Sequence, residues 1–125
     1  MDSLRNFKLI LKTLGDDTRL RIVNLLHRHS LNVAELCTIL SSTQPNISKH
    51  LTRLRLTGMV EDRRQGRSVY YYLSKPKNQF HQDLFDCILS GLSESETLRE
   101  DLNRLEELRG VLRTESGIEK GGMEK

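Results

Sequence analysis

The sequence predicts a mainly α-helical domain that carries a single β-hairpin. Two observations favour this fold class. Apolar residues recur at helical spacing along most of the chain, and one segment, residues 60–73, is rich in strand-forming residues on both sides of a glycine. The chain has 125 residues, of which 36% are hydrophobic, and only two cysteines. This is enough for one compact core without a disulfide framework.

The first two helices are expected on either side of a turn at Gly15. Asp16 follows that glycine and is suited to cap the second helix, which we expect to run to about His27. Each segment has one apolar face. In the first helix this face comprises Leu4, Phe7, Ile10, Leu11 and Leu14, and in the second it comprises Leu20, Ile22, Val23, Leu25 and Leu26.

Two further helices are predicted to be joined by a short polar turn. Asn32, with Glu35 three residues later, fits a capping box at the start of a helix that extends to about Leu40. Thr43 is placed to cap the next helix, which should run to residue 57 and stop at Gly58. This arrangement is typical of a helix-turn-helix.

A β-hairpin should follow directly. We expect strands over residues 60–64 and 67–73, joined by a two-residue turn at Gln65 and Gly66, and Pro76 closes the segment. A hairpin in this position is the wing of a winged helix-turn-helix.

The last part of the chain is predicted to be helical. A fifth helix over residues 78–92 has Phe80, Leu84, Cys87, Ile88 and Gly91 on one face. Ser93 and Glu96 fit another capping box, which would open a sixth helix with leucines at 98, 102, 105 and 112. We expect a DNA-binding and dimerisation domain over 1–92, an additional helix over 93–114 and a disordered tail over 115–125.

The apolar faces of the first and fifth helices exceed what so small a core can cover, which predicts a homodimer. The leucines of the sixth helix are expected to extend the same interface. Apolar runs are far shorter than the roughly 20 residues that cross a bilayer, and no signal peptide begins the chain. We therefore expect a cytoplasmic protein with no membrane partner.

Charge is distributed unevenly along the chain. Residues 1–75 contain 13 basic and 6 acidic residues, whereas residues 76–125 contain 7 basic and 11 acidic residues. The basic half can attract a polyanion.

The fourth helix carries the candidate DNA-reading face. Ile47, Leu51 and Leu54 cluster on one side and should face the core, with His50 nearer that side. No carboxylate occurs from residue 44 to residue 56. The remaining side chains are polar or basic, as base edges and phosphates in a major groove require. The candidates are Gln44, Pro45, Asn46, Ser48, Lys49, Thr52 and Arg53.

The predicted hairpin adds Arg63, Arg64 and Arg67 near its tip. These arginines can neutralise phosphates or enter a minor groove, although a charged hairpin tip can also serve solubility alone. A two-fold dimer of such a domain requires a pseudo-palindromic operator in double-stranded DNA.

Residues 11–73 resemble the ArsR/SmtB family of bacterial repressors. The resemblance rests on LKTLGDDTRLRIVNLL, NVAELCTIL and STQPNISKHLTRLRLTGMVEDRRQGRSVYYYL, and it covers about half of the chain. It implies a homodimer whose first and fifth helices form the interface. It also implies a repressor whose DNA affinity falls when an effector binds.

The effector is not specified by these residues. Relatives that sense arsenite or cadmium carry Cys-x-Cys in the third helix, but here Cys37 is followed by Thr38 and Ile39. Zinc-sensing relatives use paired ligands in the fifth helix, where this chain has His81 alone. Other relatives sense persulfides or oxidants through two cysteines, an outline that Cys37 and Cys87 fit.

Several alternatives stay open at this stage. Both cysteines can be small buried hydrophobes, or they can bind a thiophilic metal or metalloid. The regulator can be constitutive, with no effector, and a winged helix can also act as a protein-interaction adaptor. An enzyme is the least favoured class, because no nucleophile and base pair or metal cluster occurs at usable spacing.

Overall fold

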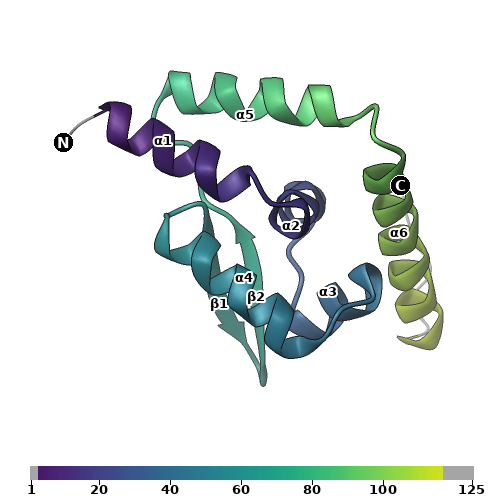
Figure 1. The fold of residues 1–125 in the computed structure, drawn as a ribbon. Helices are drawn as coiled ribbons and strands as arrows, with labels where there is room; N and C mark the ends of the chain where they lie inside the picture. The colour runs from purple at the N-terminus through teal and green to yellow at the C-terminus, as the bar shows by residue number, and fades with distance from the viewer. Residues whose placement is uncertain (1–2, 117–125) are drawn as a thin grey trace.

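The computed structural model describes residues 3–116, and within them six helices and one hairpin follow in the predicted order (Figure 1). Their bounds are α1 Ser3–Leu14, α2 Asp17–Arg28, α3 Val33–Leu40, α4 Gln44–Leu56, β1 Val60–Gln65, β2 Ser68–Leu73, α5 Gln79–Leu92 and α6 Glu96–Ser116. The winged helix-turn-helix fold class is therefore confirmed. No helix in this part of the chain is both long and apolar enough to cross a membrane.

The three predicted caps around the helix-turn-helix are present. The Asp16 carboxylate accepts from the Arg19 N–H at 3.0 Å and begins α2. Asn32 and Glu35 form a reciprocal capping box at α3, with bonds of 2.8 and 2.9 Å. The Thr43 hydroxyl accepts from the backbone of α4 at 3.3 Å. These bonds satisfy backbone donors that a helix start would otherwise leave without partners.

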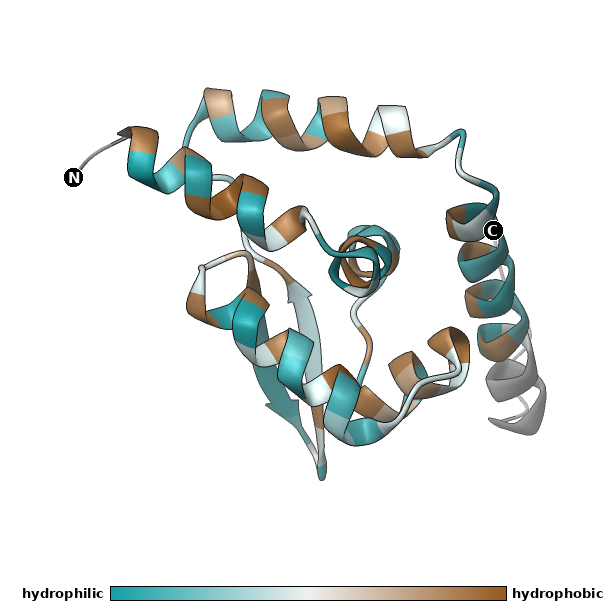
Figure 2. Ribbon diagram, in the orientation of Figure 1, coloured by the Kyte–Doolittle hydropathy of each residue, from teal (hydrophilic) through white to brown (hydrophobic). Residues whose placement is uncertain are grey.

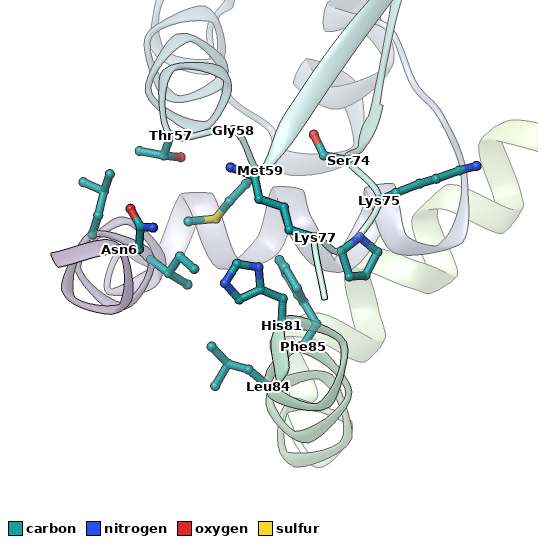
Figure 3. A pocket seen from close by; sticks show the side chains of 13 residues that line it. Asn6, Thr57, Gly58, Met59, Ser74, Lys75, Lys77, His81, Leu84 and Phe85 are labelled. Atoms are coloured by element: carbon teal, nitrogen blue, oxygen red, sulfur yellow. The ribbon is translucent and has the colours of Figure 1, made fainter. Parts of the chain in front are cut away.

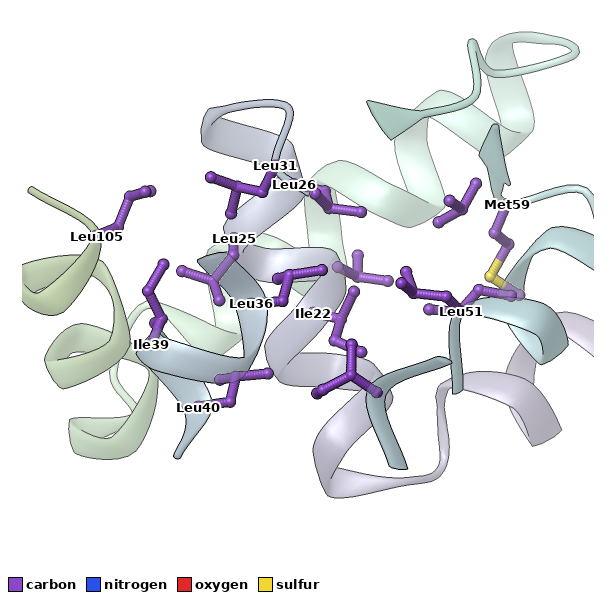
Figure 4. Packing of buried hydrophobic residues seen from close by; sticks show 14 of the residues in the cluster. Ile22, Leu25, Leu26, Leu31, Leu36, Ile39, Leu40, Leu51, Met59 and Leu105 are labelled. Carbon is purple, nitrogen blue, oxygen red and sulfur yellow. The ribbon is translucent and has the colours of Figure 1, made fainter. Parts of the chain in front are cut away.

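The core is centred on α2 and lies between α3, α4, α6 and the hairpin (Figures 1 and 4). Helix α4 contributes three side chains that are at most 1% exposed, namely Ile47, Leu51 and Leu54. The predicted inward face of this helix is thus confirmed.

The hairpin turn lies one residue later than predicted. Gln65 pairs with Ser68, so the two turn residues are Gly66 and Arg67. Gly66 has a φ of +65°, and glycine takes the first turn position in type II′ hairpins because a side chain there would be strained. The prediction placed glycine second and was therefore wrong by one residue.

Helix α6 begins differently from the prediction. Ser93 ends α5, and Ser95 instead accepts from the N–H groups of Leu98 at 3.3 Å and Arg99 at 3.1 Å. The predicted capping box of Ser93 with Glu96 is wrong, because Glu94 and Ser95 separate Ser93 from Glu96, the first residue of α6. The helix ends at Ser116, and the rest of the predicted disordered tail lies outside the described residues.

Three leucines of α6 lie against the rest of the protomer. Leu98 and Leu105 are buried, Leu105 belongs to the hydrophobic core cluster, and Leu102 packs against that cluster. Between them Asp101 is fully buried and accepts two bonds of 2.9 Å from the Arg21 guanidinium of α2 and one of 3.0 Å from Arg104. The expectation that these leucines extend the dimer interface was wrong for Leu98 and Leu105, because both side chains are already buried within the protomer.

Helices α1 and α5 lie side by side on the opposite side of the protomer from the tip of the hairpin (Figure 1). They keep exposed apolar surface: Leu4 is 65% exposed, Leu11 is 56% exposed and Phe80 is 54% exposed. No residue of α5 is buried in the protomer. Hydrophobic segments recur along both helices in Figure 2, whereas much of β1 is hydrophilic.

Candidate nucleic-acid interface

Helix α4 lies beside the hairpin (Figure 1), and most of its polar side chains are exposed to solvent. Its exposed side chains include Gln44, Pro45, Lys49, Thr52 and Arg53, and Asn46 and Ser48 are partly exposed. This set corresponds to the face predicted from the sequence. We refer to these seven residues as the α4 polar face.

One member of the α4 polar face already has a partner. The Asn46 side-chain amide donates to the Ser42 hydroxyl at 2.9 Å, four residues earlier in the turn between α3 and α4. Lys49, Thr52 and Arg53 have no such bond among the described contacts and extend from successive turns of the helix. The lysine and the arginine are therefore the most available cations on this face.

The wing arginines are all exposed. The Arg63 guanidinium lies 5.3 Å from the centre of the Tyr72 ring, a cation–π contact across the two strands. Arg67 lies in the turn itself and Arg64 pairs with Val69 near the end of β1. The three cations are thus spread along the distal half of the hairpin.

Sequence reasoning missed the contact that joins α4 to the hairpin. Arg55, in the last turn of α4, donates to the Asp62 carboxylate of β1 at 3.2 Å. The two residues are seven positions apart across the bend at Gly58, where neither helical nor strand periodicity applies. Arg55 is consequently engaged with the wing.

His50 is confirmed on the core side of α4, at 7% exposure. Its pKa is lowered, first because burial disfavours the imidazolium and then because Arg19 and Lys49 are nearby cations, although the Asp16 carboxylate opposes this. His50 is therefore expected to be neutral near pH 7.

The two cysteines have different surroundings. Cys37 on α3 is half-buried, packs against the core and lines a shallow pocket with Val33, Ala34, Ser42 and Gln44. Cys87 on α5 is exposed in the protomer, and both thiols are free. Cys37 therefore lines the same pocket as Gln44, the first residue of α4, whereas Cys87 lies on α5, the helix that keeps exposed apolar surface.

A second cavity lies between α1, α5 and the end of the hairpin (Figure 3). Ile10 of α1, His81 and Phe85 of α5, Met59 and Lys77 are among the residues that line it. Within the described residues, no group of three His, Cys, Asp or Glu side chains is placed to hold a metal ion.

Comparison with known proteins identifies the family. Residues 16–62 match the model of the bacterial regulatory proteins of the arsR family. The chain is 40% identical over 103 residues to an arsenic resistance transcriptional regulator of Pseudomonas putida, an alignment that covers 80% of this chain and 77% of that protein. The chain belongs to the ArsR family. The resemblance predicted from the sequence is therefore confirmed.

Another curated relative and two solved structures match this chain over different shares of their length. The arsenical resistance operon repressor of Escherichia coli is 50% identical over 66 residues, which cover 52% of this chain and 56% of that repressor. A solved homodimeric winged helix-turn-helix DNA-binding domain from Mycobacterium bovis is 26% identical, with a TM-score of 0.62, over 73% of this chain and 82% of that domain. The solved structure of HlyU from Vibrio cholerae is 29% identical, with a TM-score of 0.60, over 70% of this chain and 97% of HlyU.

Proposed function

We propose that this ArsR-family protein is a homodimeric repressor that reads a pseudo-palindromic operator and is released from DNA by an effector. The α4 polar face carries the proposal. It presents exposed hydrogen-bonding and basic side chains without a carboxylate, next to a wing with three exposed arginines. Base edges in a major groove are recognised by such side chains, and phosphates by the cations around them.

The electrostatics of this surface argue against a protein-interaction adaptor. A surface for a general protein partner would not need to exclude carboxylates from thirteen consecutive helical residues. The Mycobacterium bovis structure, described as a homodimeric DNA-binding domain, further supports the proposal.

Selection from random double-stranded DNA tests the proposal. The purified protein is incubated with a random-sequence library, bound molecules are amplified over several rounds, and the affinity of the selected duplex is measured by fluorescence anisotropy. We expect an enriched inverted repeat that binds at least 1,000-fold more tightly than unselected DNA, as is typical of specific recognition. Enrichment of no sequence would reject the proposed function.

Replacement of Arg63, Arg64 and Arg67 together by alanine is expected to reduce the salt dependence of binding. Each lost phosphate contact lowers the slope of log affinity against log salt by about one, because fewer counterions are released. We therefore expect a slope smaller by about two to three per protomer when all three arginines touch phosphate. A slope equal to that of the wild type would mean that the wing does not contact phosphate.

The dimer should depend on the exposed apolar faces of α1 and α5. Leu11→Glu places a charge on a side chain that is 56% exposed in the protomer, so folding of the protomer should tolerate it. Burying that charge in an interface is costly, and the dimer should dissociate at micromolar concentration. Sedimentation velocity measures the fraction of dimer, and Lys12→Glu, at the adjacent exposed position, is the control. A wild-type monomer at micromolar concentration would contradict the proposal.

Cys37 is the proposed point at which an effector acts. It lines one pocket with Gln44, the first residue of α4, and the backbone carbonyl of Cys37 accepts from the Ser42 N–H at 3.1 Å. A new bond at this sulfur would therefore displace the turn that precedes α4, the proposed recognition helix. Thiophilic metalloids and reactive sulfur species both form bonds with a cysteine sulfur. Relatives named for arsenic and cadmium resistance support the same class of effector.

The cysteine proposal predicts different results for two matched variants. Arsenite and inorganic polysulfide are added separately to the complex of protein and selected operator. We expect Cys37→Ser to abolish release by whichever probe acts on the wild type, while Cys87→Ser retains it, and both variants to bind operator normally without the probe. Release that persists in the double variant would remove thiol chemistry from the mechanism.

A further inference from the structure

His50 is a buried polar residue on the recognition helix, and its surroundings are specific. Its imidazole Nδ1 lies 3.2 Å from Nη1 of Arg19, in the first turn of α2, and 3.8 Å from Oδ2 of Asp16, the residue that caps this helix. A guanidinium can only donate hydrogen bonds. The Nδ1 atom must therefore accept, which leaves the single proton of the neutral ring on Nε2.

The same guanidinium reaches a third helix. Arg19 Nε donates to the backbone carbonyl of Thr13 at 2.6 Å. Thr13 lies in the last turn of α1 and is 2% exposed. Because its carbonyl belongs to a helix end, it has no intrahelical donor of its own. Arg19 thus connects the end of α1 to the inner face of α4 through one rigid, planar group.

We propose that Arg19 and His50 are positioning residues that hold the recognition helix against the end of α1, and that this link exists only while His50 is neutral. The inference rests on the proposed function, since it takes α4 as the DNA-reading helix and α1 as part of the dimer interface. In a two-fold dimer, the spacing of the two reading helices depends on how each α4 is fixed to the helices of the interface. The Arg19 and His50 pair supplies a polar link in that connection.

Protonation changes which neighbour His50 can bind. An imidazolium Nδ1 carries a hydrogen, cannot accept from Arg19, and faces that cation as well as Lys49 on its own helix. Asp16 is the anion within reach. Burial raises the pKa of Asp16, but the Arg19 N–H bond and the charges of His50 and Arg19 outweigh it and lower that pKa overall. Asp16 therefore stays ionised at mildly acidic pH and can draw the imidazolium away from Arg19.

Three variants separate positioning from simple packing. His50→Asn keeps an acceptor oxygen near the place of Nδ1 and does not titrate. His50→Leu fills a similar volume without an acceptor, and Arg19→Lys keeps the charge but loses the fork that joins Thr13 to His50. At pH 7.5 we expect His50→Asn to bind the selected operator within about threefold of the wild type. The other two variants should bind the selected operator roughly tenfold or more weakly than the wild type, because each loses a hydrogen bond that involves a charged group.

The ratio of specific to non-specific affinity is the readout that a merely structural role would not move. Non-specific binding depends on phosphate neutralisation, which none of the three substitutions removes, so it should change little. Thermal unfolding and sedimentation confirm that each variant is a folded dimer under the assay conditions. A normal ratio in folded His50→Leu and Arg19→Lys dimers would overturn the proposal.

The pH profile provides the second readout. Because the pKa of His50 is lowered, the wild type should lose more specific affinity than His50→Asn as the pH falls from 7.5 to about 5, with most of the difference appearing below pH 6. His27, His29 and His81 are present in both proteins. The difference between the two profiles therefore isolates His50, and superimposable profiles would contradict the link to its neutral form.

A measurement without DNA keeps this inference separate from the proposed function. Nitrogen-15 NMR of the imidazole at pH 7.5 distinguishes the two neutral tautomers, and His50→Asn assigns the signal. We expect His50 to carry its proton on Nε2, with Nδ1 free to accept. A proton on Nδ1 would overturn the proposed pair even if an operator is selected, whereas failure to select any operator would reject the DNA-binding function and leave the NMR result to decide the pair.

Discussion

Lys49→Ala and Arg53→Ala are each expected to weaken binding to the selected operator by roughly tenfold to a hundredfold. Both side chains are exposed on the α4 polar face, and neither packs in the core. A side chain that contacts a base edge contributes about 1–3 kcal/mol of discrimination. Fluorescence anisotropy at fixed salt measures the loss. Because each change removes only exposed atoms, the free energy of unfolding should change by no more than about 0.5 kcal/mol.

A matched substitution distinguishes a local contact from net charge. Arg99→Ala removes the same charge as Arg53→Ala, but from an exposed position near the start of α6. We expect this control to bind operator nearly as the wild type does. Equal losses for all three variants would indicate a general electrostatic effect, and an unchanged affinity for Lys49→Ala across salt concentrations would mean that the recognition face is misassigned.

Leu51→Ala is expected to lower the free energy of unfolding by about 2–5 kcal/mol. Leu51 is 1% exposed and packs in the cluster of Figure 4 with α2 and α3 residues, so its truncation leaves a cavity. Leu56 belongs to the same helix but is 79% exposed. The same substitution at Leu56 should cost about 0.5 kcal/mol or less.

Urea denaturation at one fixed protomer concentration measures both leucine variants, since dimer formation makes stability depend on concentration. Loss of stability in Leu51→Ala should lower operator binding only where the variant is partly unfolded. Equal stability of the two variants would contradict the inward face of α4.

The parts of the fold that depend on local sequence could be predicted. Asp16, Asn32 and Thr43 cap their helices because the cap and its backbone donor are only three residues apart. The inward face of α4 follows from helical periodicity alone. The predicted hairpin turn was wrong by one residue because glycine fits either the first or the second position of a tight turn. The residues beside Gly66 did not distinguish the two positions.

The parts that depend on distant contacts could not be predicted. Arg21 and Asp101 are 80 positions apart, and nothing near either residue indicates that an aspartate on α6 is buried against α2. The apolar spacing of α6 was recognised, but periodicity does not say which surface an apolar face will cover. The bond between Arg19 and His50 spans 31 positions for the same reason. Only the packed structure brings these charged groups together.

Methylation protection of guanine N7 on the selected operator tests the central claim most directly. N7 lies in the major groove, where α4 is proposed to bind, and each dimer presents two copies of that helix. We predict two protected patches related by two-fold symmetry, with centres roughly 10 base pairs apart or a multiple of that spacing, and loss of both patches in Lys49→Ala. Tight binding that leaves every guanine N7 reactive would contradict a recognition helix in the major groove.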